Sequence, residues 1–349
     1  MKQSFSKILI LILFFLIIIA IIKSFKSTKI IHIIQNNPNI ESNEKVQVNV
    51  FNLKAALKPD KVYQDIPCKK LNEILKVSTT LCLFNQTADV VSNFVINKGM
   101  WEPTIVENFL KYLQNNPDWL VIDIGAEIGL FTMFSASYGR EVLASRRSLK
   151  DGSNSIEASA SYGREVLAVE PYYENAFRLH KAINLEKLSH KVTLIQNALS
   201  DKRFEIKKLS RNDFNIAGQT LLENKNEVFT REDLKKDKYM VETILFDDIT
   251  DHIPKKENGD EYKKAVMKID IEGFEPYAFM NAGRLFDRLD IRVIFMEWGN
   301  IHPQKDNYYR IQKMIFFLFE RNYQPTGPDG NLDYGDWIHW PWDIIWVKK

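Results

Sequence analysis

The chain has 349 residues, of which 45% are hydrophobic and 26% are charged. These proportions are typical of a globular protein with room for one large domain and some attached segments. The 47 basic and 45 acidic residues leave a net charge of +2. This balance excludes a strongly basic surface, so we expect no nucleic-acid partner.

The N-terminus carries an apolar run that is unlike the rest of the chain. Residues 8–22 read ILILILFFLIIIAII and lie between Lys7 and Lys23. As a helix the run spans roughly 22 Å, less than a hydrocarbon core of ~30 Å, and snorkelling lysines can cover the difference. We predict a transmembrane signal-anchor over 8–22, with residues 1–7 as a short cytoplasmic tail. A cleaved signal peptide stays open as the alternative, although no A-x-A pattern follows the run.

The flanking positive charges do not decide on which side of the membrane the domain lies, because Lys2, Lys7 and the amino terminus balance Lys23, Lys26 and Lys29. Cys68 and Cys82 are close enough in sequence to form a disulfide in an oxidising compartment, although both could instead be free and buried. Asn85-Gln86-Thr87 is a glycosylation sequon, a pattern that also occurs by chance. Together these features predict a single-pass, type II membrane protein of the Golgi or endoplasmic reticulum with a lumenal domain.

A polar segment separates the apolar run from the globular domain. Residues 23–62 are rich in Asn and Lys, which predicts a stem or linker with little core of its own. The globular domain is expected over 63–349. Its lead-in contains apolar runs that predict short strands at 80–85 and 89–96, and a helical spacing of apolar residues at 104–116.

The rest of the chain alternates between strand and helix patterns. Strands are expected at 119–125, 165–171, 191–198, 264–273, 291–298 and 343–349, with helices at 126–137, 173–187, 275–283 and 308–322. The strands are continuously apolar, which is typical of strands that are buried on both faces. We therefore predict an α/β domain with a mainly parallel sheet and helices on both faces.

The turn after the first strand has the composition of a binding loop. It reads Asp123-Ile124-Gly125-Ala126-Glu127-Ile128-Gly129. In an open parallel sheet, ligands bind beyond the carboxyl ends of the strands, where this turn is expected. Gly125 permits a tight turn and Gly129 permits close helix packing. The glycine spacing is not that of dinucleotide-binding loops, and an ordinary strand-to-helix turn stays open as the alternative.

An exact repeat interrupts the chain directly after this turn. The decapeptide SASYGREVLA occurs at 135–144 and again at 159–168. An acidic residue that holds a ribose is expected about 20 residues after the glycine turn, but Glu170 lies 45 residues after Gly125. Removing one 24-residue repeat unit brings Glu170 to 21 residues, whereas the first copy has Arg146 at the matching position. We predict a duplicated 24-residue insertion within about 135–168, with the second copy forming the second strand.

With these pieces in order, the sequence resembles the FkbM family of S-adenosylmethionine-dependent methyltransferases. The segments that carry the resemblance are MWEP (100–103), VIDIGAEIGLFT (121–132), EVLAVEP (165–171), NALSD (197–201), VETILFDDI (241–249), MKIDIEGFE (267–275) and FMEW (295–298). They cover about residues 85–349 in the order of the family. The family loop usually reads D-x-G-A-N-x-G, and here Glu127 replaces the Asn.

The resemblance implies a Rossmann-like class I methyltransferase that binds S-adenosyl-L-methionine. It implies that Asp123, Gly125, Ala126 and Gly129 line the methionine end of this cofactor, within a loop that also contains Glu127. It further implies that Glu170 accepts hydrogen bonds from the ribose hydroxyls, and that Asn197 and Ala198 flank the adenine.

The expected reaction is methyl transfer to a hydroxyl group, for which a nearby carboxylate would remove the proton. The first candidates are Asp270 and Glu272, which follow the fourth predicted strand, and Glu297 after the fifth, with His302 a few residues further on. We predict no metal, although Asp247 and Asp248 could join these carboxylates around a hard divalent ion.

The acceptor is expected to be a hydroxyl-bearing substrate, for example a glycan or a small metabolite. The tail contains Trp337, His339, Trp340 and Trp342, and aromatic faces suit sugar rings, although they could equally form aromatic core. A catalytically silent, membrane-tethered module that binds a glycan or a partner is the alternative, motivated by Glu127 and by the insertion.

Overall fold

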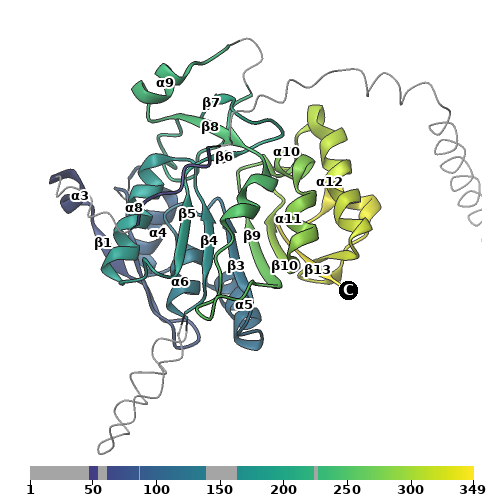
Figure 1. Ribbon diagram of the computed structural model, residues 1–349, viewed down its shortest axis with the longest axis horizontal. Helices are drawn as coiled ribbons and strands as arrows, with labels where there is room; N and C mark the ends of the chain where they lie inside the picture. Colours follow the sequence, from purple (N-terminus) through teal and green to yellow (C-terminus); the bar gives the residue numbers. More distant parts are fainter. Residues whose placement is uncertain (1–46, 54–60, 86, 139–162, 224–226) are drawn as a thin grey trace, which may run out of the picture. The chain divides into compact units, whose positions relative to one another are not determined.

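The computed structural model describes residues 47–53, 61–85, 87–138, 163–223 and 227–349 (Figure 1). The predicted cytoplasmic tail and the predicted anchor at 8–22 lie outside the described residues, as does most of the predicted insertion. Within the described ranges, no helix is both long and apolar enough to span a bilayer. The anchor and the insertion therefore stay predictions.

The described domain is organised around an eight-stranded sheet with the order β12-β11-β13-β10-β9-β3-β4-β5. The strands are β3 (Leu120–Ile124), β4 (Val166–Val169), β5 (Val192–Ile195), β9 (Lys264–Ile269), β10 (Asp290–Glu297), β11 (Tyr323–Gly327), β12 (Gly330–Asn331) and β13 (Asp343–Lys348). Neighbouring strands from β5 to β10 pair in parallel, whereas β13 is antiparallel to both β10 and β11. The chain winds outward from β3 to β5 and then crosses to β9, which confirms the mainly parallel, Rossmann-like sheet.

Helices cover both faces of this sheet. The helices are α3 (Lys61–Asp65), α4 (Val90–Lys98), α5 (Pro103–Asn115), α6 (Leu130–Ser137), α8 (Tyr173–Leu185), α9 (Arg231–Lys236), α10 (Glu275–Ala278), α11 (Gly283–Arg288) and α12 (Tyr308–Glu320). Alternate strand residues enter two separate cores: Val121 joins α5, α6 and α8, whereas Ile122 joins α11 and α12. Because both faces are buried, β3 and β4 are apolar along their whole length apart from Asp123.

The second copy of the repeated decapeptide supplies β4, as the sequence predicts. Its residues 166–168 pair in parallel with residues 121–123 of β3. The first copy supplies the last residues of α6, up to Ser137. Glu170 therefore follows β4 directly. Because β3 and β4 are parallel neighbours, their carboxyl ends lie at the same edge of the sheet (Figure 1).

A small three-stranded sheet lies beyond the carboxyl ends of β4 and β5, at the top of Figure 1. It consists of β6 (Ala198–Leu199), β7 (Ile206–Lys208) and β8 (Met240–Ile244) in the order β6-β8-β7. Four 3₁₀ helices complete the described elements: η1 (Phe246–His252), η2 (Phe279–Asn281), η3 (Lys305–Asn307) and η4 (Tyr334–His339). This three-stranded sheet is not predicted from the sequence.

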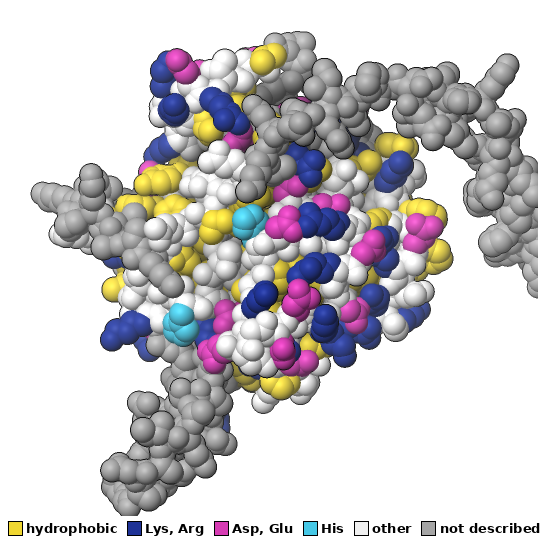
Figure 2. Space-filling view, in the orientation of Figure 1, with side chains coloured by type: hydrophobic (Ala, Val, Ile, Leu, Met, Phe, Trp, Pro, Cys, Tyr) yellow, Lys and Arg dark blue, Asp and Glu magenta, His cyan; other side chains and the backbone are white. Residues whose placement is uncertain are grey.

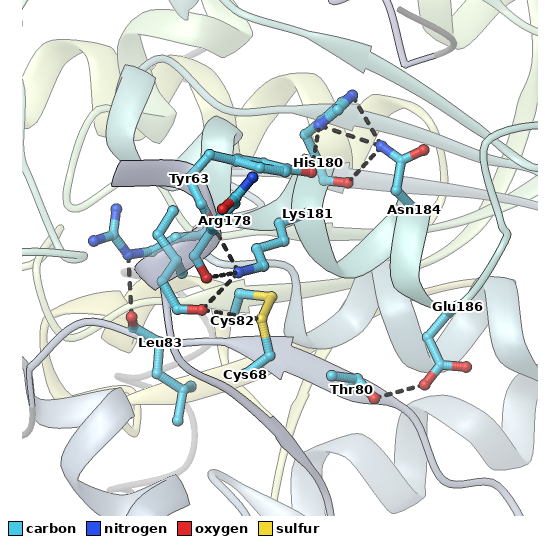
Figure 3. The surroundings of a disulfide bond; sticks show 12 residues. Tyr63, Cys68, Thr80, Cys82, Leu83, Arg178, His180, Lys181, Asn184 and Glu186 are labelled. Atoms are coloured by element: carbon cyan, nitrogen blue, oxygen red, sulfur yellow. Dashed lines mark hydrogen bonds between the residues drawn. A yellow bond between two sulfur atoms is a disulfide. The ribbon is translucent and has the colours of Figure 1, made fainter. Parts of the chain in front are cut away.

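The lead-in begins with a disulfide-linked strand pair that packs against α8. Strands β1 (Cys68–Lys70) and β2 (Thr80–Cys82) are antiparallel, with Cys68 opposite Cys82, and a disulfide joins these two residues. Figure 3 shows how α8 holds the pair: Lys181 Nζ donates to the backbone carbonyl of Ile66, and Arg178 Nε donates to that of Leu83. The bridging alternative for the two cysteines is thus the one adopted.

The predicted strand at 89–96 is wrong, because this segment forms helix α4. The Asp89 carboxylate accepts a hydrogen bond from the backbone N–H of Ser92 and caps the start of the helix. Gly99, with φ of +79°, ends it in a left-handed conformation. Val91 and Val95 are buried one turn apart. Capping at both ends outweighs the strand preference of the β-branched residues.

Part of the predicted stem packs on the domain. Residues 47–53 run beside the edge strand β5, where Val50 forms an antiparallel bridge with Ile195. Backbone hydrogen bonds link Phe51 to Leu194 and Gln196 to Asn49. An edge strand has unpaired backbone groups, and this segment satisfies some of them.

Acidic and basic side chains alternate over the face of the domain shown in Figure 2. Ion pairs over the region of α11 and α12 include Arg288 with Glu261 and Arg321 with Asp287. Such exposed pairs contribute little stability individually. The mixture agrees with the small net charge of the chain.

Candidate active site

A cavity of about 520 Å³ opens at the carboxyl edge of the sheet, beyond β3, β4, β9 and β10. Its size is within the range of cavities that bind small molecules and cofactors. Most of the predicted site residues lie on its wall: Gly125, Glu127, Glu170, Asn197, Ala198, Asp270, Glu272 and Glu297. The fold thus brings residues that are distant in sequence to a single site.

The turn after β3 approaches the end of β9 so closely that it requires glycine. A Cβ atom on Gly125 would lie 1.8 Å from the carbonyl oxygen of Asp270. Gly125 also has φ of +76°, a conformation that favours glycine. Gly125 and Asp270 therefore lie side by side on the cavity wall.

Three residues of the predicted loop lie behind the cavity wall. Asp123 is 1% exposed and accepts a hydrogen bond of 2.5 Å from the hydroxyl of Thr132, so it holds α6 against β3. Burial raises the pKa of Asp123 to about 6, against the effect of that hydrogen bond. Ala126 is buried, and a Cβ atom on Gly129 would meet the side chain of Leu179 in α8. The structure therefore gives these three residues packing contacts, and it does not bring them to the wall with Gly125.

Glu170 lies beside the glycine turn, as the repeat argument predicts. Its Oε2 accepts a hydrogen bond of 2.7 Å from the backbone N–H of Glu127. Its Oε1 accepts one of 2.8 Å from the backbone N–H of Tyr172 and a longer one from the side chain of Asn175. Burial raises the pKa of Glu170 to about 8, although these hydrogen bonds lower it. The side chain is thereby fixed on the wall between β3 and β4.

Asn197 and Ala198 lie at the end of β5 and line the same cavity. Asn197 is 2% exposed, and its side chain forms hydrogen bonds with two other segments. Its Oδ1 accepts from the backbone N–H of Asn49, and its Nδ2 donates to the carbonyl of Glu242. Asn197 therefore shapes the wall mainly by joining the 47–53 segment to β8.

On the β9 side of the cavity, Asp270 of the wall forms an ion pair with a lysine that lies behind the wall. Lys268 is 3% exposed, and its Nζ lies 2.9 Å from Asp270 Oδ2. Burial lowers the pKa of Lys268, but the charges of Asp270 and Glu102 outweigh this effect and hold it above its usual range. Lys268 thus stays charged and fixes one carboxylate oxygen of Asp270.

Glu272 and Glu297 are joined by one amide group. Asn300 Nδ2 donates to Glu272 Oε2 at 2.8 Å and to Glu297 Oε2 at 2.9 Å. The indole N–H of Trp342 donates to the other oxygen of Glu297 at 2.8 Å. Both oxygens of Glu297 are thus hydrogen-bonded, whereas Oε1 of Glu272 lies close beside Gly218.

The two carboxyl groups differ in how readily they ionise. Burial, followed by the charge of Asp270, raises the pKa of Glu272 to about 7. The same two causes and the charge of Glu272 raise the pKa of Glu297 to about 9. A general base works best when its pKa is near the operating pH, which favours Glu272.

The other residues that the sequence suggests for proton transfer or metal binding lie away from the cavity wall. Asp248 pairs with Arg203, and Asp247 accepts from the backbone N–H of Leu285. Neither these residues nor His302 lines the cavity. In the part of the chain that the structure describes, no cluster of acidic, His and Cys side chains has an arrangement suited to a metal ion.

Sequence reasoning missed several residues of the wall. Trp101, Glu102 and Asn300 line the side of the cavity that contains Asp270. The signal for Trp101 and Glu102 is the MWEP segment, and that for Asn300 is its position just after FMEW. Of the tail aromatics, Trp337 and Trp340 are buried in the core, whereas Trp342 is 59% exposed and lies on the wall.

Comparisons with solved structures give only weak similarities, some of them to methyltransferases. A fibrillarin pre-rRNA processing protein of Methanococcus jannaschii shares 10% identity, with 88% of this chain and 90% of that chain covered and a TM-score of 0.32. A SAM-dependent O-methyltransferase of Thermotoga maritima shares 11% identity, with 82% and 80% covered and a TM-score of 0.31. These weak overlaps carry no information about substrate. No curated protein matches the chain.

The family comparison is decisive. The model of the methyltransferase FkbM domain matches residues 123–325, which is more than half of the chain. The matched region begins at Asp123, near the end of β3, and extends into β11, so it contains the strand ends that surround the cavity. The chain therefore belongs to the FkbM methyltransferase family.

Proposed function

We propose that this chain transfers a methyl group from S-adenosyl-L-methionine to a hydroxyl group. The observation that carries the proposal is one cavity in which Glu170 and Ala198, beyond β4 and β5, lie on one side of the glycine turn, and Asp270, Glu272 and Glu297, beyond β9 and β10, lie on the other. The family supports methyl transfer, and the carboxyl groups support a hydroxyl acceptor, because a hydroxyl must lose its proton during the reaction.

The first side of the cavity fits the cofactor. Glu170 is held by backbone N–H groups, and a carboxylate has about four acceptor positions, so it retains capacity for a ribose hydroxyl. Ala198 and Leu199 add apolar surface suited to a purine ring. When bound, the cofactor would supply an electrophilic methyl group.

The second side fits the acceptor. Asp270, held by Lys268, would orient the acceptor through its free oxygen. Glu272 would take the hydroxyl proton as the oxygen forms its bond to the methyl carbon and the bond between that carbon and sulfur breaks. Trp101 and Trp342 lie on the same part of the wall, and their faces support a sugar ring as the acceptor.

We also propose that the domain works in the lumen of the Golgi or endoplasmic reticulum, tethered by residues 8–22. The disulfide between Cys68 and Cys82 supports an oxidising compartment. Protease protection of the domain in intact microsomes tests this placement, since a cytoplasmic domain would be digested without detergent.

Cofactor binding is tested by calorimetric titration of the purified chain with S-adenosylhomocysteine. Glu170→Ala should weaken binding by about 1–3 kcal/mol through the loss of its hydrogen bonds to the cofactor. Glu232→Ala, at an exposed position on α9, is the matched control and should leave affinity unchanged. Turnover of labelled cofactor against a panel of sugars and lipids then identifies the acceptor. Binding of an acceptor without any affinity for the cofactor product would instead favour a silent binding module.

A further inference from the structure

One wall of the cavity comes from a segment that lies outside the strand ends. Residues 215–221 follow the small sheet strand β7, and most of them line the cavity. This segment has no motif that the sequence analysis singles out, and none of its residues is among the predicted site residues. Contacts with other parts of the chain hold it on the wall.

Ala217 is the point at which the segment is fixed from both sides. Its backbone N–H donates to Asp89 Oδ1 at 2.9 Å, and its carbonyl accepts from Asn175 Nδ2 at 2.8 Å. Asp89, Asn175 and Ala217 are all no more than 3% exposed. A further backbone hydrogen bond joins Ile216 to Ala88. Buried polar groups of this kind stabilise one arrangement strongly, because leaving them unpaired is costly.

These contacts connect the segment to the cofactor side of the cavity. Asn175, in the first turn of α8, also reaches Glu170 Oε1 at 3.3 Å. Asp89 uses its second oxygen to cap α4, and α4 contributes Val90 and Val91 to the wall. The chain of hydrogen bonds therefore runs from α4 through Ala217 to the carboxylate expected to hold the ribose.

The same segment also contacts the acceptor side. The hydroxyl of Thr220 donates to the backbone carbonyl of Glu272 at 2.8 Å. A Cβ atom on Gly218 would lie 2.8 Å from Glu272 Oε1, so the segment passes the candidate base at close range. One segment of seven residues thus touches both halves of the cavity.

We propose that Asp89 and Asn175 are positioning residues that fix the 215–221 segment, and through it the placement of Glu170 relative to Glu272. This inference rests on the proposed function, because it assigns the segment to the alignment of the cofactor with the acceptor. Neither residue touches the reacting atoms. Their effect is to keep both sides of the cavity in one geometry, on which in-line methyl transfer depends.

Two variants distinguish the role of Asp89 as the cap of α4 from its hydrogen bond to Ala217. In Asp89→Ser, the serine hydroxyl can still cap the helix, but the oxygen that binds Ala217 is lost. Asn175→Ala removes the link from the other side. We expect each variant to weaken S-adenosylhomocysteine binding about tenfold in calorimetry. Hydrogen exchange should accelerate within 215–221 while the exchange of β3 and β9 stays unchanged.

A variant that combines Asp89→Ser with Asn175→Ala, together with a matched control, tests the inference further. Because both side chains act on Ala217, the double variant should cost less than the two single losses combined. Thr230→Ala removes the cap of α9, a helix without buried residues, and should leave affinity unchanged. Single variants that bind within twofold of the wild type would overturn the inference, while the proposed function stands. Absence of binding by the wild-type chain would instead overturn the proposed function itself.

Discussion

Glu127 occupies a backbone conformation that suits a different residue. Its φ is +52°, in the left-handed region where Asn and Gly are favoured and other side chains are strained. Burial and the nearby charges of Asp89, Asp270, Glu272 and Glu170 raise its pKa well above the usual range. The residue that replaces the Asn of the family loop is therefore both strained and inclined to stay protonated.

We expect Glu127→Asn to raise the melting temperature by about 2–4 °C, because it relieves roughly 1 kcal/mol of strain. The gain should be larger at pH 9 than at pH 5, since the buried carboxyl group destabilises the fold once it ionises. Lys187→Asn is the matched control, because Lys187 has φ of +56° and is exposed outside the cavity. Its gain should not depend on pH, and an equal pH dependence in both variants would contradict the explanation.

Glu272 and Glu297 are the two candidates for the base, and single substitutions distinguish between them. Glu272→Gln should lower kcat about 10²–10⁴-fold with little change in cofactor affinity. The wild-type rate should rise with pH through the pKa of Glu272 near 7, and the variant should lose this rise. Full activity of Glu272→Gln, combined with an inactive Glu297→Gln, would reassign the base to Glu297.

At the scale of elements, the disulfide strand pair is a separable support of the domain. The bridge between Cys68 and Cys82 closes a loop with a sequence separation of 14. Loop-closure entropy assigns about 3 kcal/mol to a bridge of this length. The double Cys→Ser variant should therefore melt several degrees lower while binding the cofactor product normally, because neither strand lines the cavity.

A reducing agent provides the control for this prediction. It should lower the melting temperature of the wild type toward that of the double variant, and it should not affect the variant. A wild-type melt that does not respond to the reductant, with the bridge shown by mass spectrometry to be broken, would contradict a stabilising role.

The elements that the sequence predicts correctly are those with long apolar runs. Val121 and Val166 lie in strands that are buried on both faces, so a continuous apolar run identifies them. Glu170 could be placed because the distance from Gly125 is fixed by one strand-helix-strand unit, once the repeat is removed. The mainly parallel sheet and the meeting of its strand ends at one edge could be inferred from these pieces and from the order of the family motifs.

The parts that the sequence does not predict depend on contacts between distant segments. The sequence predicts a strand where helix α4 forms, because Val90 and Val91 favour strands, whereas the caps at Asp89 and Gly99 decide the outcome. The small sheet has strands of two to five residues, which are too short for a periodic pattern. The position of Ala217 follows from side chains of α4 and α8, to which no local pattern points.

At the scale of the whole molecule, a group of six acidic side chains lies at one edge of the sheet. Glu102, Glu127, Glu170, Asp270, Glu272 and Glu297 line a cavity whose wall contains no Lys or Arg among the described residues. Burial raises the pKa of Glu102 to about 7, of Glu170 to about 8 and of Glu297 to about 9. The ordinary value for these groups is 4.5. The folded chain therefore holds protons that the unfolded chain has already released.

This difference predicts how stability depends on pH. Between the ordinary and the raised pKa values, the folded state binds more protons than the unfolded state, so stability falls as the pH rises. The contribution of these groups is fully present below about pH 4.5 and is lost as the pH passes through 7 to 9. Melting curves without cofactor should thus move down by several degrees between pH 6 and pH 9. Glu297→Gln should flatten this decline, because an amide cannot ionise, whereas Glu232→Gln, at an exposed site, should retain it. A flat wild-type profile would show that the cavity carboxyl groups ionise normally in the folded chain, and it would remove the reason to favour Glu272 over its neighbours as the base.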